Sequence, residues 1–338
     1  MIPGRESTAC PKRRAGKIGL IGAGGRIGSE IRRALKKLAP DIDVICASRT
    51  PQGRDWRRVD ASDHDSILEF SRDCVLIINA SGTRVNGEGL RIVDLGEEYC
   101  ESAETAIYGC GAAPGILGLF PLVLAKGFER VDRIRVDYLI NEPMTLTAAK
   151  DMAKRYSTSG YSNFGSITTP CSMPFFGDSV YSYPYSDDES RGVEKLLGVQ
   201  HSSWSMVRRS DDFEKILTAP YTDRDEFVRK LVEQSHVAQL GQKNEFVMTV
   251  YLNGESEGKK TELTAFAQCD SPAALSGKAC AAAAIGLYEG VLRRGIYRLP
   301  FCDNRLALWD IFMRSDPFDT YKLYPYALND GAETDGEI

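Results

Sequence analysis

The first part of the chain alternates short apolar runs with amphipathic stretches. An apolar run that starts at Lys17 ends at the glycines beginning with Gly22, and further runs cover 42–47 and 74–79. The stretch 29–38 places its apolar residues on one helical face: Ile31, Ala34, Leu35 and Leu38. Residues 74–79 are apolar almost throughout, which is typical of a strand buried on both faces of a parallel sheet. The pattern predicts an α/β domain built on a doubly wound parallel sheet.

The second half of the chain follows another pattern. Two strand-like runs, 245–252 and 261–268, are separated by a polar Asn-Gly-Glu turn region that starts at Asn253, and they predict a hairpin. An alanine-rich stretch over 273–294 and the stretch 224–240 predict helices. In the latter, apolar residues recur at helical intervals: Phe227, Leu231 and Val232. We therefore expect an α+β domain with an antiparallel sheet.

A glycine-dense turn joins the first apolar run to the first helix. Gly22 permits the tight turn, Gly24 and Gly25 let backbone approach a pyrophosphate, and Gly28 allows close helix–strand packing. Arg26 and Ile27 lie in the same turn. Because a strand precedes the turn and a helix follows it, we interpret it as the dinucleotide cradle of a Rossmann fold. A purely structural turn is the alternative.

The length of 338 residues predicts two domains. We expect a flexible arm over 1–15 and a dinucleotide-binding domain over 16–120. A substrate or dimerisation domain covers 121–285, and a C-terminal segment over 286–338 returns to the first domain.

The tip of the second predicted strand indicates the cofactor. An NAD site usually has an acidic residue there, but this chain has Ser48, Arg49 and Thr50. A hydroxyl and a guanidinium suit a 2′-phosphate, which favours NADP(H) over NAD(H). The alternative is that Arg49 is a solvated loop residue.

Later strand ends supply further candidate contacts. Asp60 follows a short strand and is expected near the adenine. The carboxyl end of the run 74–79 should reach the ligand crevice of an open α/β sheet. We therefore expect its last residues on the nicotinamide side of the cofactor: Asn79, Ala80, Ser81 and Gly82. Structural turn-formers would show the same residue types.

Composition and residue spacing argue against several kinds of binding partner. The net charge is −5 and no long basic tract occurs, which argues against nucleic acid. No apolar run is long enough for a membrane span, and no signal peptide is evident, so we expect a cytoplasmic protein. The nine cysteines form no CxxC pair and the three histidines are far apart, so no metal site is predicted.

The Gly-x-Gly-x-x-Pro-Gly run over 109–115 is the segment that most clearly carries a resemblance to a known family. With the glycine turn, the hairpin and the alanine-rich helix, this segment resembles the domain junction of saccharopine dehydrogenase-like reductases. The resemblance implies NADP(H)-dependent hydride transfer, commonly at a C–N bond, with Gly111 beside the cofactor and the helix start after Gly115 facing it. Many saccharopine reductases have an acidic residue at the position of Ala113, so saccharopine itself is not assigned as substrate.

Several side chains are candidate proton donors or substrate anchors. Cys110, Tyr161 and His201 are the three that we select, and Tyr108, Lys154 and Tyr156 are further possibilities. The alternative for Cys110 is a buried spacer, because structural cysteines are usually inert. His201 is a lone histidine whose alternative is a structural or exposed role.

The sequence leaves several functions open. We expect a homodimeric imine (C=N) reductase acting on a small metabolite; an enoyl or carbonyl reductase and a non-catalytic NADP(H) sensor are the alternatives. Residues 155–188 are rich in Tyr, Phe, Ser and Gly and show little periodicity. They are expected to line a substrate pocket, form a dimer arm or make a plain loop.

Overall fold

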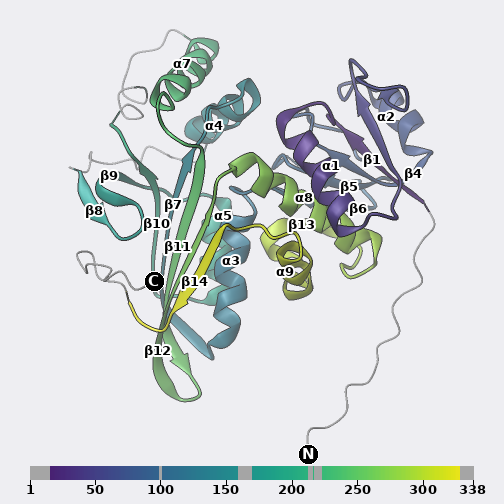
Figure 1. The fold of residues 1–338 in the computed structure, drawn as a ribbon. Coiled ribbons are helices and arrows are strands. Elements are labelled where there is room, and N and C mark those ends of the chain that lie inside the picture. Colours follow the sequence, from purple (N-terminus) through teal and green to yellow (C-terminus); the bar gives the residue numbers. More distant parts are fainter. Residues whose placement is uncertain (1–15, 99–100, 159–169, 212–215, 217–222, 328–338) are drawn as a thin grey trace, which may run out of the picture. The chain divides into compact units, whose positions relative to one another are not determined.

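The computed structural model describes residues 16–98, 101–158, 170–211, 216 and 223–327 (Figure 1). The chain divides into two compact units, and each is described by itself. The first comprises Met1–Gly111 and Gly277–Ser315, and the second comprises Ala112–Ser276 and Asp316–Ile338. The domain boundaries predicted from the sequence are at residues 120 and 285.

The first unit is built on a seven-stranded sheet in the order β13-β6-β5-β4-β1-β2-β3. All neighbouring strands in it run parallel. The strands are β1 (Lys17–Ile21), β2 (Val44–Ser48), β3 (Arg57–Arg58), β4 (Cys74–Asn79), β5 (Arg91–Asp94), β6 (Thr105–Tyr108) and β13 (Ile296–Arg298). The strand order reverses between β1 and β4, where open α/β sheets bind their ligands. The predicted doubly wound parallel sheet is confirmed.

Two helices of the first unit correspond to predicted ones, those expected over 29–38 and 273–294. The helices of this unit are α1 (Arg26–Leu38), α2 (His64–Ser71), most of α8 (Pro272–Tyr288), η3 (Leu299–Phe301) and α9 (Arg305–Met313). Helix α1 buries Ile31, Ala34 and Leu35, as its periodicity predicts. The prediction that the alanine-rich helix reaches residue 294 is wrong. Gly290 adopts a left-handed conformation with φ of 73°, which ends the helix after Tyr288.

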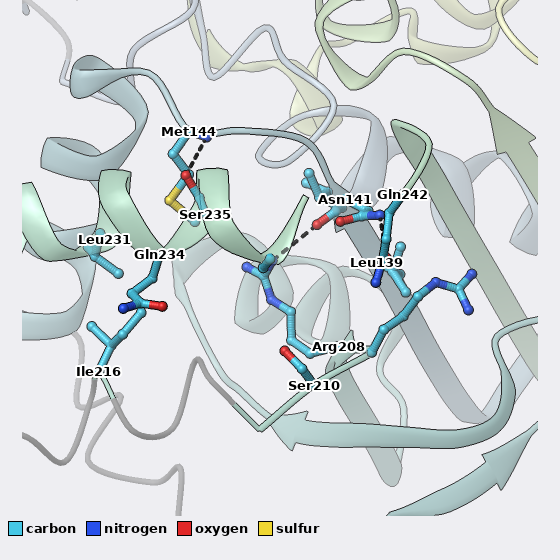
Figure 2. Close-up of a pocket in the computed structure, with 13 residues that line it drawn as sticks. Leu139, Asn141, Met144, Arg208, Ser210, Ile216, Leu231, Gln234, Ser235 and Gln242 are labelled. Atoms are coloured by element: carbon cyan, nitrogen blue, oxygen red, sulfur yellow. Dashed lines mark hydrogen bonds between the residues drawn. The ribbon is translucent and has the colours of Figure 1, made fainter. Parts of the chain in front are cut away.

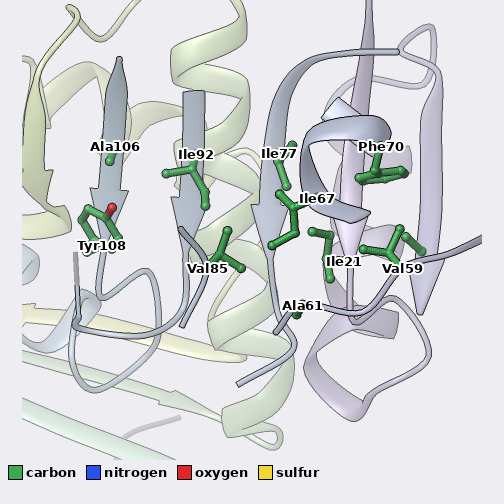
Figure 3. Close-up of a cluster of buried hydrophobic side chains, with 11 residues drawn as sticks. Ile21, Val59, Ala61, Ile67, Phe70, Ile77, Val85, Ile92, Ala106 and Tyr108 are labelled. Atoms are coloured by element: carbon green, nitrogen blue, oxygen red, sulfur yellow. The ribbon is translucent and has the colours of Figure 1, made fainter. Parts of the chain in front are cut away.

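One buried apolar cluster connects the strands of the first unit to α2 (Figure 3). Ile21, Ile77 and Ile92 come from β1, β4 and β5, and Ile67 and Phe70 come from α2. Each of these side chains is at most 6% exposed. Burial at this level stabilises by about 1.5–3 kcal/mol for each large side chain, so the cluster holds the strand ends in register.

The second unit contains a seven-stranded mixed sheet in the order β14-β12-β11-β7-β10-β9-β8. The strands are β7 (Arg130–Asn141), β8 (Cys171–Met173), β9 (Gly177–Pro184), β10 (His201–Arg208), β11 (Glu245–Ser256), β12 (Lys259–Cys269) and β14 (Thr320–Tyr324). The predicted hairpin is confirmed as β11–β12, but its turn lies further along the chain than expected. Residues 253–255 pair with β12 as part of β11, and the turn is made by Glu257 and Gly258, which both have positive φ. The sheet is not wholly antiparallel, because β10 pairs with β7 in parallel.

The helices of the second unit are α3 (Ile116–Leu124), η1 (Ala125–Gly127), α4 (Leu146–Thr158), α5 (Asp188–Leu197) and α7 (Arg224–Ala238). The helix predicted over 224–240 is confirmed as α7, with Phe227 and Leu231 buried and Val232 half-buried.

Part of the segment 155–188 forms strands, which the sequence analysis did not predict. Strand β9 pairs antiparallel with β8 and with β10. Met173, Phe176 and Val180 are buried in an apolar cluster with residues of neighbouring strands. The aromatic and polar residues therefore complete a sheet edge instead of forming a plain loop. Residues 159–169 lie outside the described residues.

A buried carboxylate holds the start of α3. The backbone N–H of Gly115, the N-cap residue, donates to both oxygens of Glu189, at 3.1 and 2.9 Å. Glu189 is 4% exposed, and a Cβ on Gly118 would lie 2.6 Å from its Cγ, so only glycine admits this approach. A negative charge is favourable at a helix N-terminus. The start of α3, which was predicted to face the cofactor, thus contacts a carboxylate of its own unit.

Substitution of Glu189 should loosen α3. In Glu189→Ala the buried N–H of Gly115 loses its acceptor, which should lower the free energy of unfolding by about 1–3 kcal/mol. Glu189→Gln retains an acceptor oxygen and should lose less. Amide hydrogen exchange along residues 116–124 measures the change, with Arg191→Ala, exposed on the same helix, as control. Wild-type protection in Glu189→Ala would contradict this assignment.

Candidate functional site

The glycine turn between β1 and α1 is a place where three backbone segments meet. Gly22 has a φ of 80°, and a Cβ there would lie 2.6 Å from the carbonyl carbon and oxygen of Ala80. A Cβ on Gly28 would lie 2.1 Å from the oxygen of Gly22. Both positions require glycine, because the atoms in the way are backbone atoms.

The start of α1 presents peptide groups without a side-chain cap. Gly25 is the N-cap residue, it makes no side-chain cap hydrogen bond, and the first turn contains no acidic residue. Gly24, Gly25 and Arg26 are exposed, Ile27 is half-buried and Gly28 is buried. Helix N-termini of this kind favour anions, because their first N–H groups lack partners within the helix.

The end of β2 places a hydroxyl and a guanidinium next to this turn. Ser48 donates its hydroxyl to the carbonyl of Thr50 at 2.6 Å, and Arg49 and Thr50 are exposed. Gln52 is a further residue of this turn region that was not predicted as a site residue. A Cβ on Gly24 would lie 2.7 Å from the Gln52 amide nitrogen, so the Gln52 side chain lies across the turn.

Asp60 lies near the same arginine. Hydrogen bonds from the Ser62 hydroxyl and backbone N–H, followed by the charges of Arg49 and Arg58, lower the pKa of Asp60. Asp60 is exposed and therefore ionised at neutral pH. The neighbouring loop residues line a cavity of about 220 Å³ together with α2 and the loop after β4: Ala61, Ser62, His64, Ile67, Arg84 and Asn86. His64 and Arg84 were not predicted as site residues.

The carboxyl end of β4 is held by a buried polar network. Asn79 is 2% exposed, and its amide nitrogen donates to Asp94 Oδ2 at 2.8 Å and to the carbonyl of Thr83 at 2.9 Å. Its amide oxygen accepts hydrogen bonds from the Ser81 backbone N–H and hydroxyl. Asp94 Oδ1 in turn accepts from Gly96 N at 2.7 Å.

This network changes the role of Asn79. Its side chain shapes the turn that contains Ala80, Ser81 and Gly82, where Gly82 has a φ of 70°. The surface next to Gly22 is therefore made by backbone groups of that turn. Asp94 positions the same turn; the sequence analysis missed it, because an acidic residue at a strand end also occurs in ordinary turns.

The predicted catalytic residues are not brought together within one unit. Cys110 belongs to the first unit and is fully buried, and its thiol donates to the carbonyl of Ile107 at 3.3 Å. Burial, followed by the nearby Cys280, Cys302 and Asp94, raises the pKa of Cys110 well above its usual value. The thiol is therefore protonated at neutral pH, which favours the buried-spacer alternative. Gly111, next to it, is also buried.

The other two candidates lie elsewhere in the chain. His201 is the exposed first residue of β10 in the second unit, opposite Arg133 of β7. Tyr161 lies outside the described residues. Both remain predictions from the sequence.

Among the described residues, no group of three or more His, Cys, Asp or Glu side chains is placed to hold a metal ion. Within that part of the chain, no helix combines the length and the apolar character needed to cross a membrane.

Comparison with known proteins gives only remote structural likeness. No protein-family model matches the chain, and no curated protein matches its sequence. An engineered D-amino acid dehydrogenase bound to NADP⁺ is 12% identical, with 86% of this chain and 95% of that chain covered and a TM-score of 0.47. The C. glutamicum DAP dehydrogenase in complex with DAP is 11% identical, with 88% and 98% covered and a TM-score of 0.47.

A third solved structure, levoglucosan dehydrogenase in complex with NADH and L-sorbose, is 11% identical. The match covers 92% of this chain and 99% of that chain, with a TM-score of 0.34. Likeness at this level does not decide function. The resemblance to saccharopine dehydrogenase-like reductases stays a prediction.

Two alanine substitutions separate folding from binding in the glycine turn. Gly28→Ala should destabilise the first unit by about 1–3 kcal/mol, because its Cβ meets the Gly22 oxygen at 2.1 Å. In Gly25→Ala the nearest atom is the same oxygen at 3.3 Å, so the fold should tolerate the change. The methyl group of the new alanine at position 25 would nevertheless cover exposed N–H groups and weaken NADPH binding. Thermal unfolding and NADPH titration measure the two effects. Wild-type NADPH affinity in Gly25→Ala would contradict the site.

Proposed function

We propose that the first unit binds NADP(H) and that the protein is an NADP(H)-dependent oxidoreductase acting on a small metabolite. The observation that carries this proposal is the uncapped start of α1 behind the Gly22 turn, at the strand-order reversal between β1 and β4. Such a helix start suits a pyrophosphate. Ser48 and Arg49, at the end of the neighbouring strand β2, support the phosphorylated cofactor.

The remaining parts of the site support one orientation of the bound cofactor, with its adenine and its nicotinamide at different ends of the site. The cavity of about 220 Å³ near Asp60 suits the adenine, with the Arg84 guanidinium available for stacking and His64 for a hydrogen bond. The turn 80–82 at the end of β4 suits the nicotinamide side. The buried Asn79–Asp94 pair holds that turn in one conformation, which reduces the loss of freedom on binding.

When bound, the nicotinamide supplies the hydride. The residues of the chain would bind and orient it: backbone N–H groups of Gly24 and of the first turn of α1 would hold the phosphates, and Arg49 would hold the 2′-phosphate. A C=N bond is the proposed acceptor because an imine nitrogen can already carry its proton, so reduction requires no strong general acid from the protein. Cys110 is buried and protonated, so its thiol is not placed to act as a general acid, and an imine does not require one.

A non-catalytic NADP(H) sensor is the second candidate. It is favoured by the burial of Cys110, which removes the thiol from reach of a ligand. Incubation with NADPH and a panel of cyclic imines, enones and ketones, followed by NADPH absorbance, separates the two. Turnover of an imine supports the reductase, turnover of only enones or ketones moves the assignment to another double bond, and NADPH binding without turnover supports the sensor. The homodimer and the cytoplasmic location stay predictions from the sequence.

Cofactor selection should depend on Arg49. Arg49→Gln should weaken NADPH binding about tenfold or more and leave NADH binding unchanged, because a charged hydrogen bond to the 2′-phosphate is lost. Fluorescence titration of both cofactors measures the change. Arg33→Gln is a matched control, since Arg33 is an exposed arginine on α1 that pairs with Glu30. Equal affinity of the wild-type protein for NADH and NADPH would contradict the selection of NADP(H).

A further inference from the structure

The second unit contains a cavity of about 60 Å³ where the ends of β7 and β10 meet α7 (Figure 2). Arg208 enters it from β10 and donates to the carbonyl of Ile140 at 3.1 Å. The cavity wall at Ile216 adjoins residues 212–215 and 217–222, which lie outside the described residues, and we assign no ligand to it. The loop between β2 and β3 in the first unit, by contrast, is described in full.

This loop, residues 49–56, is fixed at its base and contains a turn. Strand β3 pairs in parallel with the last two residues of β2. The backbone N–H of Val59 donates to the carbonyl of Ser48 at 3.1 Å, which joins the two ends of the loop. Inside the loop, the backbone N–H of Trp56 donates to the carbonyl of Gly53 at 3.2 Å and closes the turn.

A cation–π contact attaches the loop to α1. The guanidinium carbon of Arg32 lies 5.2 Å from the centre of the Trp56 ring, a distance at which the two groups attract each other. Trp56 is half-buried, and a Cβ on Gly53 would lie 3.0 Å from its Cδ1, so the indole packs closely against the loop backbone. The loop is therefore held by α1 as well as by the sheet.

Gln52 extends from this loop over the glycine turn. From the position that a Cβ on Gly24 would take, the Gln52 amide nitrogen lies at 2.7 Å, the amide carbon at 3.0 Å and the amide oxygen at 3.4 Å. The nitrogen end of the amide is thus the part nearest to Gly24. Gly24 belongs to the surface on which the pyrophosphate is proposed to bind.

The Gln52 amide has donors to offer at this position. Within the described part of the chain, no hydrogen bond joins this amide to another residue. Its two N–H groups therefore remain for solvent or for a ligand. Gly24 and Gly25 are exposed beside it, and the first turn of α1 contains no acidic residue. An anion at this place would meet donors from the helix start and from Gln52.

We propose that Gln52 is a further cofactor-binding residue, whose side-chain amide donates a hydrogen bond to the pyrophosphate at the start of α1. This inference rests on the NADP(H) site proposed above. The amide lies in the space next to Gly24 that a phosphate needs, so the flexible side chain has to turn as the phosphates enter, while Trp56 and Arg32 hold the loop. A donor suits this place because a hydrogen bond to a charged acceptor is stronger than one between neutral groups.

Titration of NADPH and NADH into Gln52→Ala and Gln52→Met tests the assignment. Methionine keeps an unbranched side chain of similar length without the donor, so both variants should bind each cofactor about tenfold more weakly. The loss should be equal for NADPH and NADH, because the two cofactors share the pyrophosphate and differ at the 2′ position. Arg49→Gln, in contrast, should weaken NADPH alone.

Gln200→Ala is the matched control, because Gln200 is an exposed glutamine of the second unit. It should bind both cofactors as the wild-type protein does, and thermal unfolding verifies that each variant is folded. Wild-type affinity in Gln52→Met would show that the side chain only fills space, and a loss confined to NADPH would place it at the 2′-phosphate; either result would overturn the proposal. Binding of neither cofactor by the wild-type protein would instead remove the cofactor site itself, which is a different result from normal binding by the wild type and the Gln52 variants alike.

Discussion

The contact between three backbone segments at Gly22 is the constraint on which the candidate cofactor site depends. The Gly22 turn lies against Ala80 on one side and against Gly28 of α1 on the other, so close that a Cβ on Gly22 or Gly28 would overlap backbone atoms. Because side chains are excluded, β1, β4 and α1 converge on a surface made of peptide groups. Such a surface can approach a phosphate more closely than one covered by side chains.

Polar side chains beneath that surface hold it in place. Asn79 uses its amide for the turn after β4, and Asp94 connects that turn to the end of β5. Removing one partner would leave buried polar groups without hydrogen bonds, which is costly at low local dielectric. The second unit uses the same principle at Glu189, whose carboxylate accepts the N–H of Gly115 at the start of α3. In both units a buried carboxylate fixes a backbone segment.

The parts of the fold that the sequence predicts are those with a local pattern. The β1–turn–α1 segment and the hairpin β11–β12 carry their periodicity and turn residues in adjacent positions. The parallel pairing of β10 with β7 was missed, because it joins strands far apart in the chain. The same reason applies to Asp94 and to the cavity at Arg208, which three separate segments assemble. The sequence left two roles open for Cys110, a catalytic thiol and a buried spacer, because periodicity alone does not show whether a residue at a strand end is buried.

The central claim is that peptide groups at the start of α1 hold the pyrophosphate of NADP(H). A crystal structure of the protein grown with NADP⁺ tests it most directly. We expect the pyrophosphate against the backbone N–H groups of Gly24 and of the first turn of α1, and the 2′-phosphate within hydrogen-bond distance of Ser48 or Arg49. A cofactor bound away from the glycine turn, or a turn left without cofactor at saturating NADP⁺, would contradict the account.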